Sequence, residues 1–213
     1  MIKAAVLSAF TTLLPLGCGV VFWRKLKKPL HVLLVFCLAS LLCDSVGITL
    51  AIGAHSNVLI TSLFSLAQLS LLGTYFAFLL PEKSSQRIAL ALLFVIFIGL
   101  FSYTYIVHSY EDYISAFRSL GVSNIVLIVL CLNFFYITLR RLEYERIETN
   151  PYFWIACGIL LHSTSCFTLA LTPDLVSTRV YGILWIYFKN IMQGLMNILL
   201  VVGILLAVRN SSA

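Results

Sequence analysis

Residues 183–208 read ILWIYFKNIMQGLMNILLVVGILLAV, and this stretch decides how the rest of the chain is interpreted. A helix needs about 20 apolar residues to cross the hydrocarbon core of a bilayer, and this run is long enough. It nevertheless contains four polar residues: Lys189, Asn190, Gln193 and Asn197. The last three, together with Gly194, recur at steps of three and four, so they share one helix face. Because polar side chains inside a membrane need a partner or water, we expect this face to line a buried polar site.

The composition extends the membrane interpretation to the whole chain. Apolar residues make up 61% and charged residues 10%, whereas soluble domains average roughly 45–50% and about 25%. The mean hydropathy is +1.03. Apolar runs that could span a bilayer cover residues 4–23, 30–54, 58–80, 88–107, 120–139, 152–171 and 183–208. Since only short connectors remain, the sequence predicts one all-α domain over residues 1–213, a polytopic integral membrane protein folded as a seven-transmembrane-helix bundle.

The basic residues predict the orientation of this bundle, because Lys and Arg concentrate in cytoplasmic loops. Ten of the fourteen fall on one side of the predicted spans: Arg24, Lys25, Lys27, Lys28, Lys83, Arg87, Arg140, Arg141, Arg146 and Arg209. Lys3, Arg118 and Arg179 fall on the other side, and Lys189 lies within a span. We therefore expect the N-terminus outside and the C-terminus in the cytoplasm. The positive charge suits anionic lipid head groups, and no nucleic-acid partner is expected, because no basic surface interleaved with aromatic residues is present.

The cysteines and histidines argue against metal and enzyme chemistry. All six cysteines lie inside predicted spans and form no C-x-x-C motif, so they are interpreted as small packing residues. Only His162 lies at mid-membrane depth, whereas intramembrane metal hydrolases need several converging histidines. No phosphate-binding loop or nucleophile motif occurs. We therefore predict no enzyme activity, no metal and no cofactor.

The remaining intramembrane polar residues fall at similar depths. With a rise of 1.5 Å per residue, Asp44 lies roughly 20 Å and His162 roughly 16 Å from one membrane face, and Lys189 roughly 9 Å from the other. An Asp44–Lys189 ion pair is the least costly arrangement, and together with the residues around it forms a candidate ligand or ion pocket. The candidates are Asp44, Gln68, His162, Lys189, Asn190, Gln193 and Asn197. Structural alternatives stay open: an ion pair without function, a snorkelling Lys189, and amide hydrogen bonds that only join helices.

Two further patterns concern helix packing and a partner. Small residues and Asp44 recur at steps of four and three along the span 30–54, which favours close helix approach: Ser40, Asp44, Gly47, Ala51 and Ala54.

The span 120–139 continues into the charged stretch 140–148, which predicts a helix projecting into the cytoplasm until Asn150-Pro151 breaks it. Its candidate docking residues are Arg140, Arg141, Glu143, Glu145 and Arg146. The alternative is a solvated helix end.

The stretch Pro151-Tyr152-Phe153-Trp154-Ile155, followed by Gly158-Ile159-Leu160, resembles a group of small bacterial seven-span membrane proteins. The resemblance extends weakly over the whole chain. It implies a seven-span fold and a place in the bacterial inner membrane. Many members look like sensory modules whose signalling partner is a separate protein. Members often carry an acidic residue where this chain has Gln68, so a charge-dependent role at that position is not implied.

Three function hypotheses follow. The leading hypothesis is a non-enzymatic, receptor-like sensor with a buried polar pocket coupled to a cytoplasmic partner through the stretch 140–148. The alternative is a small-solute or ion transporter or channel subunit that uses the same polar residues, although no inverted repeat of broken helices is visible. An intramembrane enzyme ranks third. The candidate partners are the lipid bilayer, a cytoplasmic signalling protein and a second copy of the chain.

The predicted ion pair can be tested by a double-mutant comparison. Lys189→Ala alone leaves a buried carboxylate without its counter-charge, so it should reduce the yield of folded protein more than Lys189→Ala combined with Asp44→Ala. Yield is measured by size-exclusion chromatography in detergent. Additive losses would contradict direct pairing.

Overall fold

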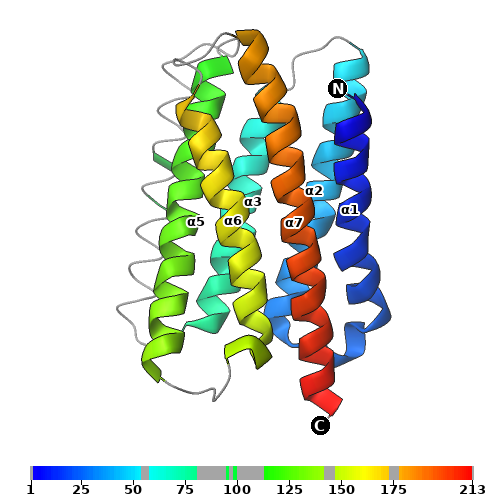
Figure 1. Cartoon of the computed structure of the whole chain (residues 1–213), viewed down its shortest axis with the longest axis vertical. Coiled ribbons are helices and arrows are strands. Elements are labelled where there is room, and N and C mark those ends of the chain that lie inside the picture. Colours follow the sequence, from blue (N-terminus) through cyan, green and yellow to red (C-terminus); the bar gives the residue numbers. More distant parts are fainter. Residues whose placement is uncertain are drawn as a thin grey trace.

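The computed structural model is a bundle of long α-helices and describes residues 2–53, 58–80, 95, 98–99, 113–141, 147–172 and 178–212. Figure 1 shows the helices standing side by side. In chain order they are α1 (Ile2–Val21), η1 (Trp23–Lys25), α2 (Lys28–Ile52), α3 (Val58–Leu79), α5 (Tyr113–Arg141), η2 (Ile147–Thr149), α6 (Pro151–Leu171) and α7 (Thr178–Ser212). The expected all-α fold class is therefore confirmed.

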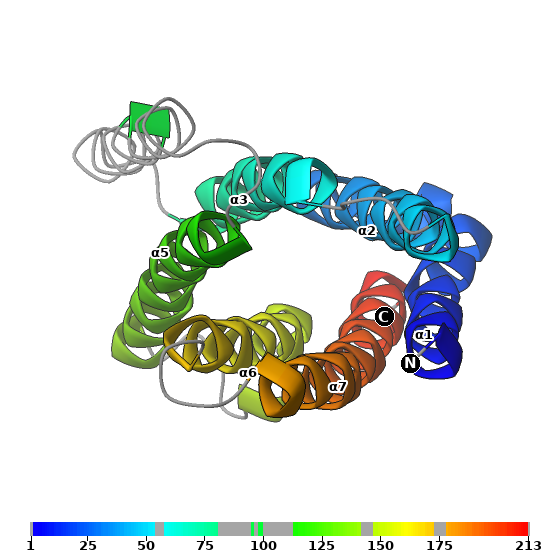
Figure 2. The same ribbon diagram turned by 90° about the horizontal axis from the view of Figure 1, so that it is seen from above.

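The six long helices that the structure describes form a closed ring. Each packs against two neighbours, in the order α1, α2, α3, α5, α6, α7 and back to α1 (Figure 2). Neighbours in the ring are neighbours along the described chain, except that α7 closes onto α1. One end of the bundle carries the α1–α2 turn, the first residues of α6 and the C-terminus (Figure 1). It also carries most of the exposed basic residues, Arg24, Lys25, Lys27, Lys28, Arg140 and Arg209, and is here named the basic end.

Most predicted span boundaries agree closely with these helices. The spans 4–23, 30–54, 58–80 and 152–171 coincide with α1, α2, α3 and α6 to within about two residues at each end, the usual uncertainty of a helix boundary. The span 88–107 lies outside the described residues except for Val95, Ile98 and Gly99, which are helical. The seven-span count therefore stays a prediction.

Two helices begin earlier than expected. α5 begins at Tyr113 and α7 at Thr178, whereas the sequence predicted spans from residues 120 and 183. The assignment of residues 113–119 and 178–182 to connectors was therefore wrong. The physical reason is that an apolar run measures only the stretch that fits the hydrocarbon, while backbone hydrogen bonding continues a helix beyond it.

The junction between α5 and α6 agrees with the sequence prediction at the start of α6 and differs from it in the residues before Asn150. Asn150 caps α6, because its side-chain oxygen accepts a hydrogen bond of 2.9 Å from the Tyr152 backbone N–H, and Pro151 occupies the first turn. The predicted helix over 140–148 was wrong at its end, since Ile147–Thr149 forms a separate 3-10 helix. Residues 142–146 lie outside the described part of the chain. Asn150-Pro151 therefore marks the start of α6, and that it ends an extension of α5 stays a prediction.

Helix length and composition are those of a multi-pass membrane protein. Among the described residues, four helical stretches are long and apolar enough to cross a membrane: Lys28–Leu50, Gly121–Arg140, Pro151–Leu171 and Tyr187–Ser211. Their outward faces carry large apolar side chains that water would not favour, including Leu38 and Leu42 on α2, Val129 and Leu132 on α5, and Ile191 and Ile198 on α7. Such faces suit a lipid environment, in which polar groups turn inward.

Close helix approaches occur at two glycines, but not at Gly47 of the predicted seam of α2. A Cβ atom on Gly203 of α7 would lie 2.8 Å from the Pro151 carbonyl oxygen of α6, and one on Gly19 of α1 would overlap the Leu34 side chain of α2. A Cβ on Gly47 would meet nothing within 4 Å. The prediction of close packing at Gly47 was therefore wrong. Small residues permit a close approach, but a neighbouring helix must be positioned to use it.

Gly203→Ala tests the contact between α6 and α7. The added methyl group would collide with a backbone carbonyl that cannot rotate away, so the free energy of unfolding should fall by about 1–3 kcal/mol. Thermal unfolding in detergent, followed by circular dichroism, measures this loss. Gly17→Ala is the matched control, because nothing lies within 4 Å of its added Cβ and alanine favours helix. Equal effects of the two substitutions would contradict the close approach.

Candidate functional site

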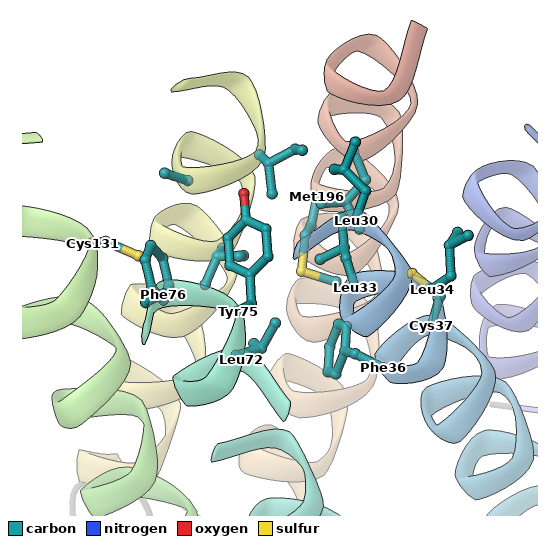
Figure 3. Close-up of a cluster of buried hydrophobic side chains, with 14 of the residues drawn as sticks. Leu30, Leu33, Leu34, Phe36, Cys37, Leu72, Tyr75, Phe76, Cys131 and Met196 are labelled. Atoms are coloured by element: carbon teal, nitrogen blue, oxygen red, sulfur yellow. The ribbon is translucent and has the colours of Figure 1, made fainter. Parts of the chain in front are cut away.

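The interior of the ring changes character along its length. The half nearer the basic end holds most of a large buried apolar cluster, including Leu33 and Phe36 of α2 and Tyr75 of α3 (Figure 3). The other half holds most of the buried polar side chains: Thr12, Ser40, Ser65, Gln68, Ser123, Asn124, His162, Ser163, Ser165, Gln193 and Asn197. The candidate site is therefore the polar half of the ring interior. The buried apolar cluster between it and the basic end is here named the apolar plug.

The polar face of α7 turns inward as the sequence predicted. Gln193 and Asn197 are 3% and 1% exposed, while Leu195 and Ile198 of the same helix are 43% and 52% exposed. Asn190, one turn earlier on the same face, is partly buried. The rotation of α7 about its own axis is thus fixed with amides inside and aliphatic side chains outside, as lipid requires.

Gln193 joins α7 to α2. Its Nε2 atom donates a hydrogen bond of 3.0 Å to Oδ2 of Asp44 and lies 3.4 Å from the Ser40 hydroxyl. Asp44 and Ser40 are one turn apart on α2 and present their oxygens together. An amide that donates to a carboxylate in a half-buried place replaces the water that Asp44 loses, which makes the acidic residue tolerable there.

Asn197 joins α7 to α1 in the same manner. Its Nδ2 atom donates to the hydroxyl oxygens of Thr11 and Thr12 at 3.0 and 3.1 Å. The two threonines are adjacent in an apolar run, and sequence reasoning did not include them among the candidates. The sequence did contain a pattern that could have indicated them, because hydroxyl side chains in an apolar helix are common hydrogen-bond partners for amides of a neighbouring helix. α7 is therefore tied by one amide to α2 and by the next to α1.

On the other side of α7 from α1, the wall of the interior comes from α6. His162 is 6% exposed, and its Nε2 atom lies 3.6 Å from the Cys166 thiol one turn later. Its other ring nitrogen, Nδ1, has no hydrogen-bond partner, and neither does the fully buried Ser163 hydroxyl. Ser165 contrasts with Ser163, because its hydroxyl donates to backbone carbonyls of its own helix at 2.8 Å. α6 thus presents two buried polar atoms, His162 Nδ1 and the Ser163 hydroxyl oxygen, that have no hydrogen-bond partner in the described part of the chain.

Lys189 lies beside this wall. Gly158 of α6 faces Met196 of α7. The two helices run antiparallel, so seven residues back along α7 to Lys189 correspond to seven forward along α6, to Ser165. Lys189 therefore lies at about the level of Ser165, and its proximity to His162 stays a prediction.

The remaining candidates are placed as follows. Gln68 of α3 is 2% exposed, and its Nε2 atom has no partner. Asp44 receives the Gln193 amide, and its direct ion pair with Lys189 stays a prediction. Arg140 is exposed at the basic end, where Nη1 lies 3.5 Å from the Tyr136 hydroxyl oxygen, and Arg141 ends α5. Glu143, Glu145 and Arg146 lie outside the described residues.

Metal binding finds no support in the part of the chain that is described. No three His, Cys, Asp or Glu side chains there come together as a metal ion would require. All six cysteines carry free thiols, three of them buried. What the arrangement offers is hydrogen bonding and charge in a half-enclosed interior.

In comparisons with known proteins, no family model, no curated protein and no solved structure matches this chain. The resemblance to small seven-span bacterial proteins therefore stays a prediction, and function has to be argued from the site itself.

The Gln193–Asp44 hydrogen bond gives a quantitative prediction. Gln193→Leu leaves the carboxylate without its amide, so we expect a loss of stability that is smaller when Asp44→Leu is already present. The coupling free energy should be about 0.5–2 kcal/mol, as for hydrogen bonds between membrane helices. Thermal or SDS-induced unfolding of the four proteins measures it. Leu195→Ala, on the outward face of α7, should show no coupling to Asp44→Leu; a coupling near zero for Gln193 would contradict the bond.

Proposed function

We propose that this chain is a seven-span bacterial inner-membrane protein that acts as a non-enzymatic, receptor-like sensor. A ligand or membrane condition is perceived in the polar half of the ring interior. The response passes to a cytoplasmic partner at the basic end, where the α5–α6 connector lies.

The orientation of the proposal rests on charge. The basic end carries the exposed residues of the α1–α2 turn together with Arg140 and Arg209. Because Lys and Arg are retained on the cytoplasmic side, this end is assigned to the cytoplasm and the N-terminus to the outside. Trp23 and His31 pack edge to face at the same end, 4.2 Å between ring centroids, as aromatic residues at a membrane interface do.

The division of the interior into a polar half and an apolar plug carries the proposal. A receptor needs polar groups on one side only, where the stimulus arrives. A permeation path would have to open through any apolar layer, as the hydrophobic gates of channels do. In this ring buried Leu, Ile and Phe side chains from α2, α3, α5, α6 and α7 lie between most of the buried polar residues and the basic end. The division therefore favours sensing over transport.

α7 supplies a physical connection between the two halves. It holds Gln193 and Asn197 in the polar half and continues as one helix to Ser212. At its far end Asn210 Nδ2 donates to the Thr149 carbonyl oxygen of η2 at 3.2 Å. A small rotation or shift of α7 caused by a changed hydrogen bond at Gln193 would thus act directly on the α5–α6 connector.

The transporter alternative keeps the same polar residues and adds a requirement, that the apolar plug opens. Asp44 would then be the ion- or proton-binding group on the path. It differs from the sensor proposal in a single observable, which is solute flux across a sealed membrane.

The proposal is tested by coupling between the two ends. A cysteine introduced as Glu145→Cys is labelled with a membrane-impermeant maleimide from the basic side, with the unsubstituted chain giving the background of the native cysteines. Gln193→Leu should change the labelling rate about fivefold or more, the lower range of coupling between distant sites. Thr168→Val is the control, because Thr168 is exposed on α6 and bonds the Thr164 carbonyl of its own helix.

A flux assay in proteoliposomes completes this test. The sensor proposal expects no solute flux above that of empty liposomes. Flux of an ion or small solute that Asp44→Asn abolishes would overturn it in favour of transport. An unchanged labelling rate in Gln193→Leu would contradict the coupling.

A further inference from the structure

The turn between α1 and α2 presents four exposed cations in close succession: Arg24, Lys25, Lys27 and Lys28. Leu26, in the middle of this group, is 7% exposed and belongs to the buried apolar cluster. The Leu26 backbone N–H donates to the Trp23 carbonyl oxygen at 3.3 Å, and His31 Nε2 of α2 lies 3.2 Å from the same oxygen. The turn is therefore anchored inward by Leu26, and its charges face outward on both sides of that anchor.

The end of α7 adds a fifth cation at the same place. α1 and α7 are neighbours in the ring and run in the same direction (Figure 1). Their register is set by the hydrogen bond between Asn197 and Thr12, and twelve residues further along each segment stand Arg209 and Arg24. Arg209 is exposed and therefore lies at about the level of the turn. We name this surface the basic corner: Arg24, Lys25, Lys27, Lys28 and Arg209.

Little negative charge opposes the basic corner. The described part of the chain holds two acidic residues, Asp44 in the polar half of the ring and Glu148 in η2, which packs against α6. Among the described residues, neither carboxylate is ion-paired with Arg24 or Arg209. Clusters of about four to eight Lys and Arg residues beside a membrane helix attract anionic lipid head groups. The basic corner has the size and the sign of charge of such a cluster.

The outward face of α1 leads directly to these charges. Val20 and Val21 are 69% and 75% exposed, the highest values among the large apolar side chains that are described. Gly17, one turn earlier, is also exposed, and a Cβ there would meet nothing within 4 Å, so the face is shallow at this point. Trp23 follows the two valines and is half exposed, as suits the level of the head groups. Apolar surface thus passes into cationic surface in the order in which the acyl chains of a phospholipid pass into its head group.

We propose that the basic corner binds the phosphate of an anionic phospholipid whose acyl chains lie along the outward face of α1. Arg24 and Arg209 suit a phosphate because a guanidinium group donates two parallel hydrogen bonds, and the three lysines add charge. A phospholipid without net charge makes the same apolar contacts but is not drawn by the cations. This inference goes beyond the sensor proposal and does not depend on it, since it concerns the outer surface at the basic end.

The test uses lipids that differ only in the head group. The full-length protein in dodecyl maltoside is titrated with dioctanoyl phosphatidylglycerol and, in parallel, with dioctanoyl phosphatidylcholine, which has the same acyl chains and no net charge. Glycerol phosphate supplies an anionic head group without chains. Phosphatidylglycerol should raise the unfolding temperature in a saturable manner, because a ligand that binds only the folded state stabilises it. The other two probes should not, and about 0.5 M NaCl should weaken the effect, because salt screens exposed charges.

Substitutions then locate the binding surface. Arg24→Gln and Arg209→Gln should each weaken the apparent dissociation constant for phosphatidylglycerol about fivefold, the usual contribution of one basic residue beside an anionic membrane surface. Arg209→Lys should retain most of the binding. Arg140→Gln is the matched control, because it removes the same charge from the same end of the bundle, but on α5, which α6 separates from α7 in the ring. It should leave the dissociation constant unchanged.

Three results would overturn the proposal. Equal stabilisation by phosphatidylcholine would mean that only apolar contacts matter. Equal stabilisation by glycerol phosphate would mean that the corner takes a free phosphate and not a lipid. Equal weakening by Arg140→Gln and Arg209→Gln would mean that the net charge of the protein acts without a defined surface. None of these results bears on the sensor proposal, which is decided by the labelling rate and by solute flux.

Discussion

A polar side chain inside a lipid-embedded bundle must find its partner within the protein, and this constraint organises the ring. Gln193 meets it through Asp44, and Asn197 through Thr11 and Thr12. Two amides one turn apart thus hold α7 against α2 and α1 and fix its rotation. Turned the other way, the amides would face lipid and aliphatic side chains would face the interior.

The same constraint separates the interior into layers. Wherever inward positions are Leu, Ile or Phe, the helices pack without hydrogen bonds, as in the apolar plug near the basic end. Wherever they are polar, helices must be matched in register so that donors meet acceptors. The plug can therefore tolerate small shifts that the polar half cannot. A bundle built in this way responds to changes in its polar half and transmits them through α7, whose end bonds η2.

Two serines on one turn of α6 illustrate how position decides role. Ser163 and Ser165 are both buried, but Ser165 satisfies its hydroxyl on carbonyls of its own helix, whereas Ser163 has no partner in the described protein. Serine and threonine in apolar helices usually bond the backbone in the manner of Ser165. A buried hydroxyl that does not do so is available to something else.

The sequence by itself determined the all-α class, the ends of four helices, the inward face of α7 and the break at Asn150-Pro151, because apolar runs, helical periodicity and capping act over one or two turns. Only the tertiary structure decided that Gln193 is the amide bonded to Asp44, that Thr11 and Thr12 accept from Asn197, and that Gly47 faces open space. These contacts join helices distant in sequence. They depend on the register and rotation of whole helices, which the packing of the ring sets and no single span encodes.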